Sequence, residues 1–237
     1  MKKQEIFKRN KKNYDEQYAG KQIAFLKYPN ESLIRFHHMY LKENKPKGNV
    51  LDYGCGAGNN SKFLLDMGYK VFGCDIYENA QKVINKNLKN HPNKKKFIFT
   101  KINPDINKLP YDDESFDIII SNQVLYYLSG KEQIQAICKE FNRCLKRDGI
   151  VYFTMMGPQN YYITDFSTDL GDDLYEIRIS KKNHYLDGLH EVIYIVKDEE
   201  KLKELFGVFE PISIGYWMFK LLRIPNNFHW VFTGKKK

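Results

Sequence analysis

One stretch of the chain decides the fold: Leu51-Asp52-Tyr53-Gly54-Cys55-Gly56-Ala57-Gly58. It opens like a buried strand, and the pattern after it predicts a helix that begins at Asn59 or Asn60 and stops at Gly68. Alternating glycines between a strand and a helix allow a tight turn and let the backbone approach a ligand closely. The helix also offers free N–H groups and the positive end of its dipole. We therefore expect a ligand-binding loop here.

Outward from this loop, short apolar runs alternate with helical patterns. The predicted strands are 50–53, 71–74, 97–100, 116–121 and 150–154, and the predicted helices are 59–67, 78–89 and 131–146. The last of these helices should end at Asp148-Gly149. This order predicts an α/β fold with a Rossmann-like, doubly wound sheet that is mostly parallel with an antiparallel last strand. The carboxyl ends of the parallel strands then share one rim, where ligands bind.

Two regions stand outside this alternation. Residues 1–45 are polar and predict an N-terminal helical cap with a break at Tyr28-Pro29. Residues 46–237 then form the main domain, in which 158–197 predict an insertion after the fifth strand that acts as a substrate lid. The other predicted elements are strands at 175–179, 191–196, 211–217 and 228–233 and a helix at 198–206.

Composition limits the class of protein. The 237 residues suit one domain with an elaboration, and a hydrophobic content of 42% is enough for a sizeable core. The four cysteines form no C-x-x-C pair, which favours reduced thiols in a cytoplasmic protein and disfavours a zinc site. No apolar run reaches the roughly 18 residues of a membrane span. The basic N-terminus lacks the apolar segment of a secretory signal.

The formal net charge of +9 allows two interpretations. A basic chain can bind nucleic acid or another anionic partner. The lysine runs, however, lie at the termini and in a loop rather than along one helix face, which favours solvated surface charge. We therefore expect no nucleic-acid partner, and the oligomeric state is left open.

A carboxylate at the end of the second predicted strand limits the classes of ligand that the loop can bind. Asp75 follows Gly58 by 17 positions and can accept hydrogen bonds from both hydroxyls of a ribose. The loop carries Asn59 where the dinucleotide fingerprint requires Gly or Ala, so NAD is not expected. A nucleoside that is not part of a dinucleotide fits both observations.

Two further motifs identify a family resemblance. They are Asp105-Ile106-Asn107-Lys108-Leu109-Pro110-Tyr111-Asp112-Asp113-Glu114-Ser115-Phe116-Asp117 and Val124-Leu125-Tyr126-Tyr127-Leu128. With the glycine loop, they resemble the class I S-adenosylmethionine-dependent methyltransferases, in particular the small-molecule group with the LPF-x-D-x-SFD signature. The resemblance covers about residues 48–157, with its three motifs in the family's order. It implies S-adenosylmethionine as cofactor and S-adenosylhomocysteine as product.

The resemblance also implies a set of cofactor contacts. Asp52 would organise the loop, whose glycines would lie against the methionine part of the cofactor. Asp75 would hold the ribose. The loop glycines are Gly54, Gly56 and Gly58. The adenine would be contacted by Ile76, Asp105 and Ile106, and the sulfonium would be flanked by Asn122 and Gln123. The cofactor carboxylate would be met by Arg35 or Tyr18.

Several specialised methyltransferase classes are disfavoured by missing residues. Enzymes that methylate amino groups of nucleic acids carry [DNS]-P-P-[YFW] where this chain reads Ser121-Asn122-Gln123-Val124. Cytosine C5 enzymes need a Pro-Cys nucleophile, and the chain contains no such dipeptide. Metal-dependent catechol-type enzymes need a carboxylate where Ser121 stands, so no metal is expected.

The acceptor chemistry stays less defined. Tyr126-Tyr127 stands where many relatives carry a histidine, so His184, His190 and Tyr126 are the candidate catalytic groups. Nothing in the sequence pairs either histidine with an orienting partner, which favours a surface or structural role for both. The main hypothesis is methyl transfer to an O or N atom of a small polar molecule, with a saccharide or a cell-envelope intermediate as candidates. An RNA methyltransferase and a non-catalytic S-adenosylmethionine-binding protein are the alternatives.

Overall fold

The computed structural model describes residues 3–19, 28–77, 79–103, 108–182, 184, 186–221 and 224–237. Within these residues the α-helices are α1 (Lys3–Ala19), α2 (Glu31–Phe36), α3 (Lys42–Asn44), α4 (Asn59–Asp66), α5 (Ala80–Asn87), α6 (Lys131–Cys144), α7 (Tyr161–Phe166) and α8 (Glu199–Leu205). The shorter helices are the π-helical η1 (His37–Leu41) and the 3₁₀ turns η2 (Lys94–Lys96) and η3 (Leu125–Tyr127).

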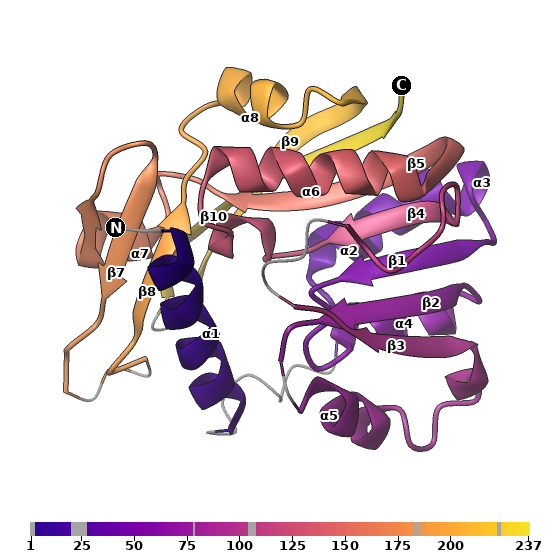
Figure 1. Ribbon diagram of the computed structural model, residues 1–237, viewed down its shortest axis with the longest axis horizontal. Coiled ribbons are helices and arrows are strands. Elements are labelled where there is room, and N and C mark those ends of the chain that lie inside the picture. The colour runs from indigo at the N-terminus through magenta and orange to yellow at the C-terminus, as the bar shows by residue number, and fades with distance from the viewer. Residues whose placement is uncertain are drawn as a thin grey trace.

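Ten strands lie in the described residues: β1 (Asn49–Tyr53), β2 (Lys70–Asp75), β3 (Phe97–Lys101), β4 (Phe116–Ser121), β5 (Leu145–Met156), β6 (Ser167–Asp169), β7 (Leu174–Arg178), β8 (His190–Tyr194), β9 (Phe209–Leu221) and β10 (Ile224–Lys236). Seven of them form one sheet in the order β3-β2-β1-β4-β5-β10-β9 (Figure 1). The strands β1 to β5 pair in parallel, and β10 runs antiparallel to β5. This confirms the predicted fold class, including the antiparallel last strand.

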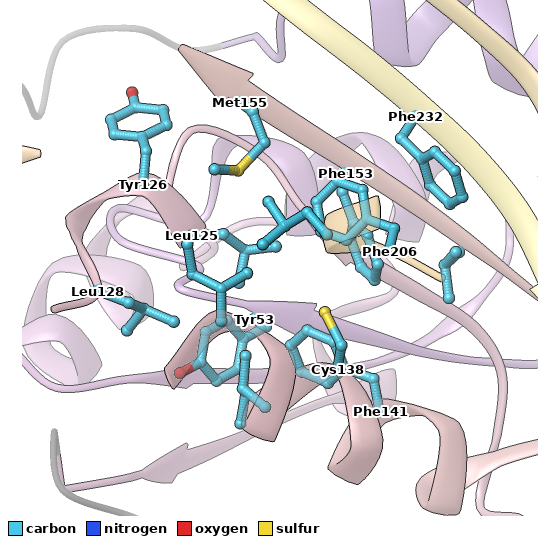
Figure 2. Close-up of a cluster of buried hydrophobic side chains, with 14 of the residues drawn as sticks. Tyr53, Leu125, Tyr126, Leu128, Cys138, Phe141, Phe153, Met155, Phe206 and Phe232 are labelled. Atoms are coloured by element: carbon cyan, nitrogen blue, oxygen red, sulfur yellow. The ribbon is translucent and has the colours of Figure 1, made fainter. Parts of the chain in front are cut away.

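Apolar side chains cover both faces of this sheet, as strands buried on both sides require. On one face α6 packs through Ile134, Ile137 and Phe141, and Figure 2 shows the aromatic and aliphatic side chains gathered there. On the other face the cluster includes Leu33 of α2, Leu64 of α4 and Ile84 of α5. The glycine loop thus follows β1, a strand that is packed on both faces.

Most predicted elements are present, with shifted ends. The helix predicted over 131–146 ends at Cys144, and β5 begins at Leu145 rather than at Ile150. Leu145 pairs with Phe116 of β4, and Glu114 and Ser115 donate backbone hydrogen bonds to the carbonyls of Arg143 and Cys144. The long hairpin of β9 and β10 also extends beyond the predicted 211–217 and 228–233.

A second, three-stranded antiparallel sheet has the order β6-β7-β8. It occupies residues within the predicted insertion, and Figure 1 shows α1 lying along β8. The side chain of Asn10 joins the two: its Oδ1 accepts from Val192 N at 2.9 Å and its Nδ2 donates to Val192 O at 2.7 Å. The same Nδ2 donates to Tyr127 O at 3.0 Å. One buried amide therefore ties α1 to both β8 and η3.

Two further observations concern the whole chain. All four cysteines are buried and unbridged. Burial raises the pKa of each thiol, in the case of Cys144 to about 11. In the described part of the chain, no helix combines the length and apolarity needed to cross a bilayer.

Candidate functional site

The glycine loop turns tightly between β1 and α4. Gly54 has a φ of 73°, and its N–H donates to Cys74 O at 2.9 Å. A Cβ on Gly54 would stand 2.4 Å from a methyl group of Val124, so only glycine fits between β1 and the segment after β4. Gly58, with a φ of 83°, precedes α4 as its N-cap. The loop therefore brings backbone N–H groups to the rim of the sheet.

Asp75, at the end of β2, is 3% exposed and receives two backbone hydrogen bonds. Its Oδ2 accepts from Gly56 N at 2.7 Å, and its Oδ1 accepts from Tyr77 N at 2.8 Å. Burial raises the pKa of this carboxyl, and the backbone N–H groups oppose the rise. Each oxygen of an ionised carboxylate can accept a second hydrogen bond, so Asp75 keeps capacity for hydroxyl donors.

Asp52 lies deeper, with no exposed surface. Its Oδ2 accepts from Ser61 Oγ at 2.5 Å, which links β1 to the first turn of α4. Among the residues that the structure describes, its buried Oδ1 has no hydrogen-bond partner. Burial, reinforced by the charge of Asp75, raises the pKa of Asp52 to about 6.

The segment after β4 contains a strained backbone position. Gln123 has a φ of 61°, a region that L side chains other than Asn and Asp rarely adopt. Its N–H donates to Thr154 Oγ1 at 2.7 Å, and that hydroxyl donates to Asn122 Oδ1 at 3.2 Å. Such strain is found at functional sites, because the surrounding structure must impose it.

These elements surround a cavity of about 680 Å³, a volume that includes its open mouth. The sheet rim contributes Tyr53, Gly54, Asp75, Ile76, Gln123 and Val124. The other wall comes from α1, η3 and β8 and contributes Asn10, Lys11, Tyr14, Tyr127, Leu128 and Glu191.

The rim side of this cavity fits a nucleoside cofactor. Asp75 supplies an acceptor for ribose hydroxyls, while Ile76 and Ile102 supply apolar surface for a flat base. Gly54 leaves room for close approach of the chain that follows the ribose. Of the predicted contacts, Gly54, Asp75, Ile76 and Gln123 line the cavity.

Other predicted contacts lie behind the cavity or elsewhere. Asp52, Gly56, Gly58 and Asn122 support the loop and the segment after β4 but do not line the cavity. Arg35 pairs instead with Glu31, one turn away, at 2.5 Å, and its side chain is 69% exposed. Asp105, Ile106 and the side chain of Tyr18 lie outside the described residues, so their predicted contacts stay predictions.

The candidate catalytic groups do not line the cavity either. His190 Nε2 lies 2.9 Å from Glu176 Oε1, in an ion cluster with Arg9 and Arg178 that joins α1 to β7. The ring of His184 lies against that of Phe166, and its Nδ1 accepts from Leu186 N. Tyr126 is 3% exposed, and burial raises its pKa further above its already high usual value. These three residues thus make packing and polar contacts and do not themselves line the cavity.

Sequence reasoning missed two polar residues of the cavity. Asn10 carried no sequence signal, because its role depends on contact with Val192, which is 182 positions away. Glu191 did carry one: it is a charged residue at the start of an apolar run, and it is only 5% exposed. A buried carboxylate of this kind is rare unless it is paired or functional.

Comparisons with known proteins identify methyltransferases as relatives of this chain. Residues 51–153 match the family model described as a methyltransferase domain. An uncharacterised methyltransferase from Oceanobacillus iheyensis is 22% identical over 94% of this chain and 92% of its own length. The malonyl-[acyl-carrier protein] O-methyltransferase of Legionella pneumophila is 27% identical over 47% of the chain, which spans only 37% of that enzyme.

Solved structures share the fold. The 1,6-didemethyltoxoflavin-N1-methyltransferase of Burkholderia thailandensis, solved with bound S-adenosylhomocysteine, superposes with a TM-score of 0.69 at 15% identity, over 100% of this chain and 91% of that chain. Fold, glycine loop and family match together define a class I S-adenosylmethionine-dependent methyltransferase. The cofactor of this protein is therefore S-adenosylmethionine.

Proposed function

We propose that this methyltransferase acts on an O or N atom of a small polar molecule. One observation carries the proposal: the cofactor rim and the wall formed by α1, η3 and β8 share a single cavity of about 680 Å³. A compact acceptor bound against that wall would therefore lie in the same cavity as the cofactor. Enzymes with related sequence or fold include an O-methyltransferase and an N1-methyltransferase, which supports either acceptor atom.

Each group in the cavity has a part in this proposal. S-adenosylmethionine supplies an electrophilic methyl group bonded to a sulfonium. Asp75 would hold the ribose, and Gly54 would admit the methionine part of the cofactor. Tyr14 and Tyr127 would cover the acceptor and exclude water, which aligns the reacting atoms and strengthens electrostatic contacts. The predicted closure by residues 1–45 and 158–197 is part of the same proposal.

The other sequence-based hypotheses stay predictions. A saccharide or a cell-envelope intermediate is one form of the small acceptor, and a cytoplasmic location is the compartment we propose. An RNA acceptor would have to reach a cavity whose wall includes α1 and β8. This arrangement favours a small molecule over a polymer.

A labelling experiment tests the proposal. The protein is incubated with S-adenosylmethionine that carries a radioactive methyl group, in one arm with a metabolite extract and in the other with total RNA. We expect label in small molecules only. Label in RNA alone would support the RNA alternative, and binding of S-adenosylhomocysteine without transfer in either arm would support the non-catalytic one. Asp75→Ala, expected to bind the cofactor poorly, controls for background.

A further inference from the structure

β9 is the outermost strand of the seven-stranded sheet, next to β10 (Figure 1). In the part of the chain that the structure describes, no strand pairs with its outer side. At 13 residues, β9 is also long for an edge strand. The backbone N–H and C=O groups along such an edge can pair with a further strand. The outer side of β9 is therefore a possible site for strand addition.

The middle of this edge lacks the features that usually prevent strand addition. Proteins protect an exposed edge with charged residues, proline or a bulge. In β9 these features lie at the two ends of the strand. Pro211 and an irregular register between the pairs of Ser213 and Pro211 are near its beginning, and Lys220 is near its end. The residues between them, 212–219, carry no charge.

Three apolar side chains of segment 212–219 are exposed. The exposed fractions are 63% for Tyr216, 53% for Met218 and 39% for Phe219. Because side chains alternate along a strand, Tyr216 and Met218 lie on one face of the sheet and Phe219 lies on the other. Tyr216 stacks on Phe228 with ring centroids 5.1 Å apart, and Phe219 stacks on Trp217 at 5.7 Å. Apolar surface thus reaches the edge on both faces, as a site for a protein partner requires.

The charges at the two ends of segment 212–219 have opposite signs. Glu210 precedes the segment, is exposed and lies 3.3 Å from Lys235 of β10. Lys220 follows the segment and is exposed. In an antiparallel pair of two β9 strands, Glu210 of each copy lies toward Lys220 of the other. A parallel pair would instead bring like charges together, which is unfavourable.

The pattern of β9 is therefore complementary to itself. Gly215 is equally distant in sequence from Glu210 and Lys220, and glycine within a strand often marks the close approach of another backbone. A Cβ on Gly215 would meet nothing within 4 Å, so the space beside it is open. The net charge of +9 repels two copies of the chain in general, but residues 210–220 carry one acid and one base. This segment is thus suited to contact a second copy of itself.

We propose that two copies of this chain associate through β9, paired antiparallel about a two-fold axis near Gly215. A two-fold axis places the same segment on both sides of the contact, which is the arrangement that self-complementarity favours. The two seven-stranded sheets then form one continuous sheet, and segment 212–219 of each copy is buried against that of the other. None of the described residues that line the cavity belongs to β9, so each copy keeps its own site.

The molar mass of the full chain tests this inference. Gel filtration coupled to light scattering, over a range of micromolar concentrations, should give twice the mass of one chain. Met218→Lys places a charge in the apolar contact of both copies and should raise the dissociation constant of the dimer at least about tenfold. Met39→Lys, at a methionine of η1 that is 77% exposed, is the matched control and should leave it unchanged. A monomer at every concentration, or equal dissociation constants for the two variants, would overturn the inference.

A charge exchange tests the antiparallel orientation independently of Met218. Glu210→Lys and Lys220→Glu should each weaken the dimer, and the double variant should restore it, with circular dichroism showing that all three variants are folded. A double variant that associates no more tightly than the single ones would overturn the inference.

Hydrogen exchange tests whether the contact is a strand pair. Backbone amides of segment 212–219 should exchange more slowly in the dimer than in Met218→Lys at the same concentration. Equal exchange in the two proteins would show that another surface joins the copies, which would also overturn the inference.

Discussion

Replacing Asp75 separates its binding role from its structural role. In Asp75→Ala, S-adenosylhomocysteine should bind about 1.5–3 kcal/mol more weakly, the contribution of a hydrogen bond to a charged group. This corresponds to a dissociation constant roughly 10- to 150-fold higher. The expectation follows from a buried carboxylate that lines the cavity and keeps one acceptor position on each oxygen.

The same substitution should also destabilise the loop. It leaves the N–H groups of Gly56 and Tyr77 without their acceptors at 2.7 and 2.8 Å. Each buried, unsatisfied N–H costs about 1–3 kcal/mol, partly offset by the removal of a buried charge. Asp75→Asn retains one acceptor oxygen and should lose less stability.

Calorimetry at a temperature well below the unfolding transition measures the affinity, and urea unfolding followed by circular dichroism measures the stability. Asp165→Asn, an exposed carboxylate on α7, serves as the matched control. If Asp75→Asn bound S-adenosylhomocysteine within about twofold of wild type, the carboxylate charge would have no part in binding. Asp75 would then be only a cap for the backbone of the loop.

Three further predictions follow from side chains described above. Because burial raises the pKa of Asp52 to about 6 from 3.8, the native state binds its proton more tightly than the unfolded chain, and stability is lost as pH rises through this window. Asp52→Asn should therefore raise the unfolding free energy at pH 8 by up to ~3 kcal/mol and change it little at pH 4. Urea unfolding at the two pH values measures this difference. An equal change at both pH values would contradict the prediction. Asn10→Ala removes three hydrogen bonds and should lower the unfolding free energy, measured by urea unfolding, by about 2–4 kcal/mol. Hydrogen exchange at the Val192 amide should become faster. Asn44→Ala, at an exposed position, is the control. Arg35→Ala should leave the affinity for S-adenosylhomocysteine unchanged, since the guanidinium is exposed and paired with a neighbour on its own helix, and a tenfold loss by calorimetry would restore its predicted contact.

The parallel sheet could be predicted because its signals are local. Apolar runs such as Ile118–Ile120 mark strands that are buried on both faces, and glycine turns mark their ends. Boundaries were less predictable at α6, since Leu145 is buried whether it ends a helix or begins a strand. Strand pairing with β4 decides between these states, and it depends on residues distant in sequence.

The candidate site likewise contains residues that could be predicted from the sequence and residues that could not. Gly54, Asp75 and Gln123 were predictable because each lies at the end of a strand of the parallel sheet or within two residues after it. The wall formed by α1, η3 and β8 was not predictable, because it forms only where α1 meets β8, and these two elements lie far apart in the sequence. The residue pattern of neither element indicates this contact, so the positions of Asn10 and Glu191 in the cavity could be recognised only from the three-dimensional structure.

The four buried cysteines make this protein convenient for site-specific spectroscopy. Thiolates, not thiols, react with maleimide dyes, and all four native thiols are inaccessible and have a raised pKa. A cysteine introduced at exposed Glu16 of α1 and a second at exposed Lys89 should therefore accept a donor and an acceptor fluorophore without removal of any native cysteine. Energy transfer between the two dyes would then test in real time whether α1 moves relative to the parallel sheet when ligands bind.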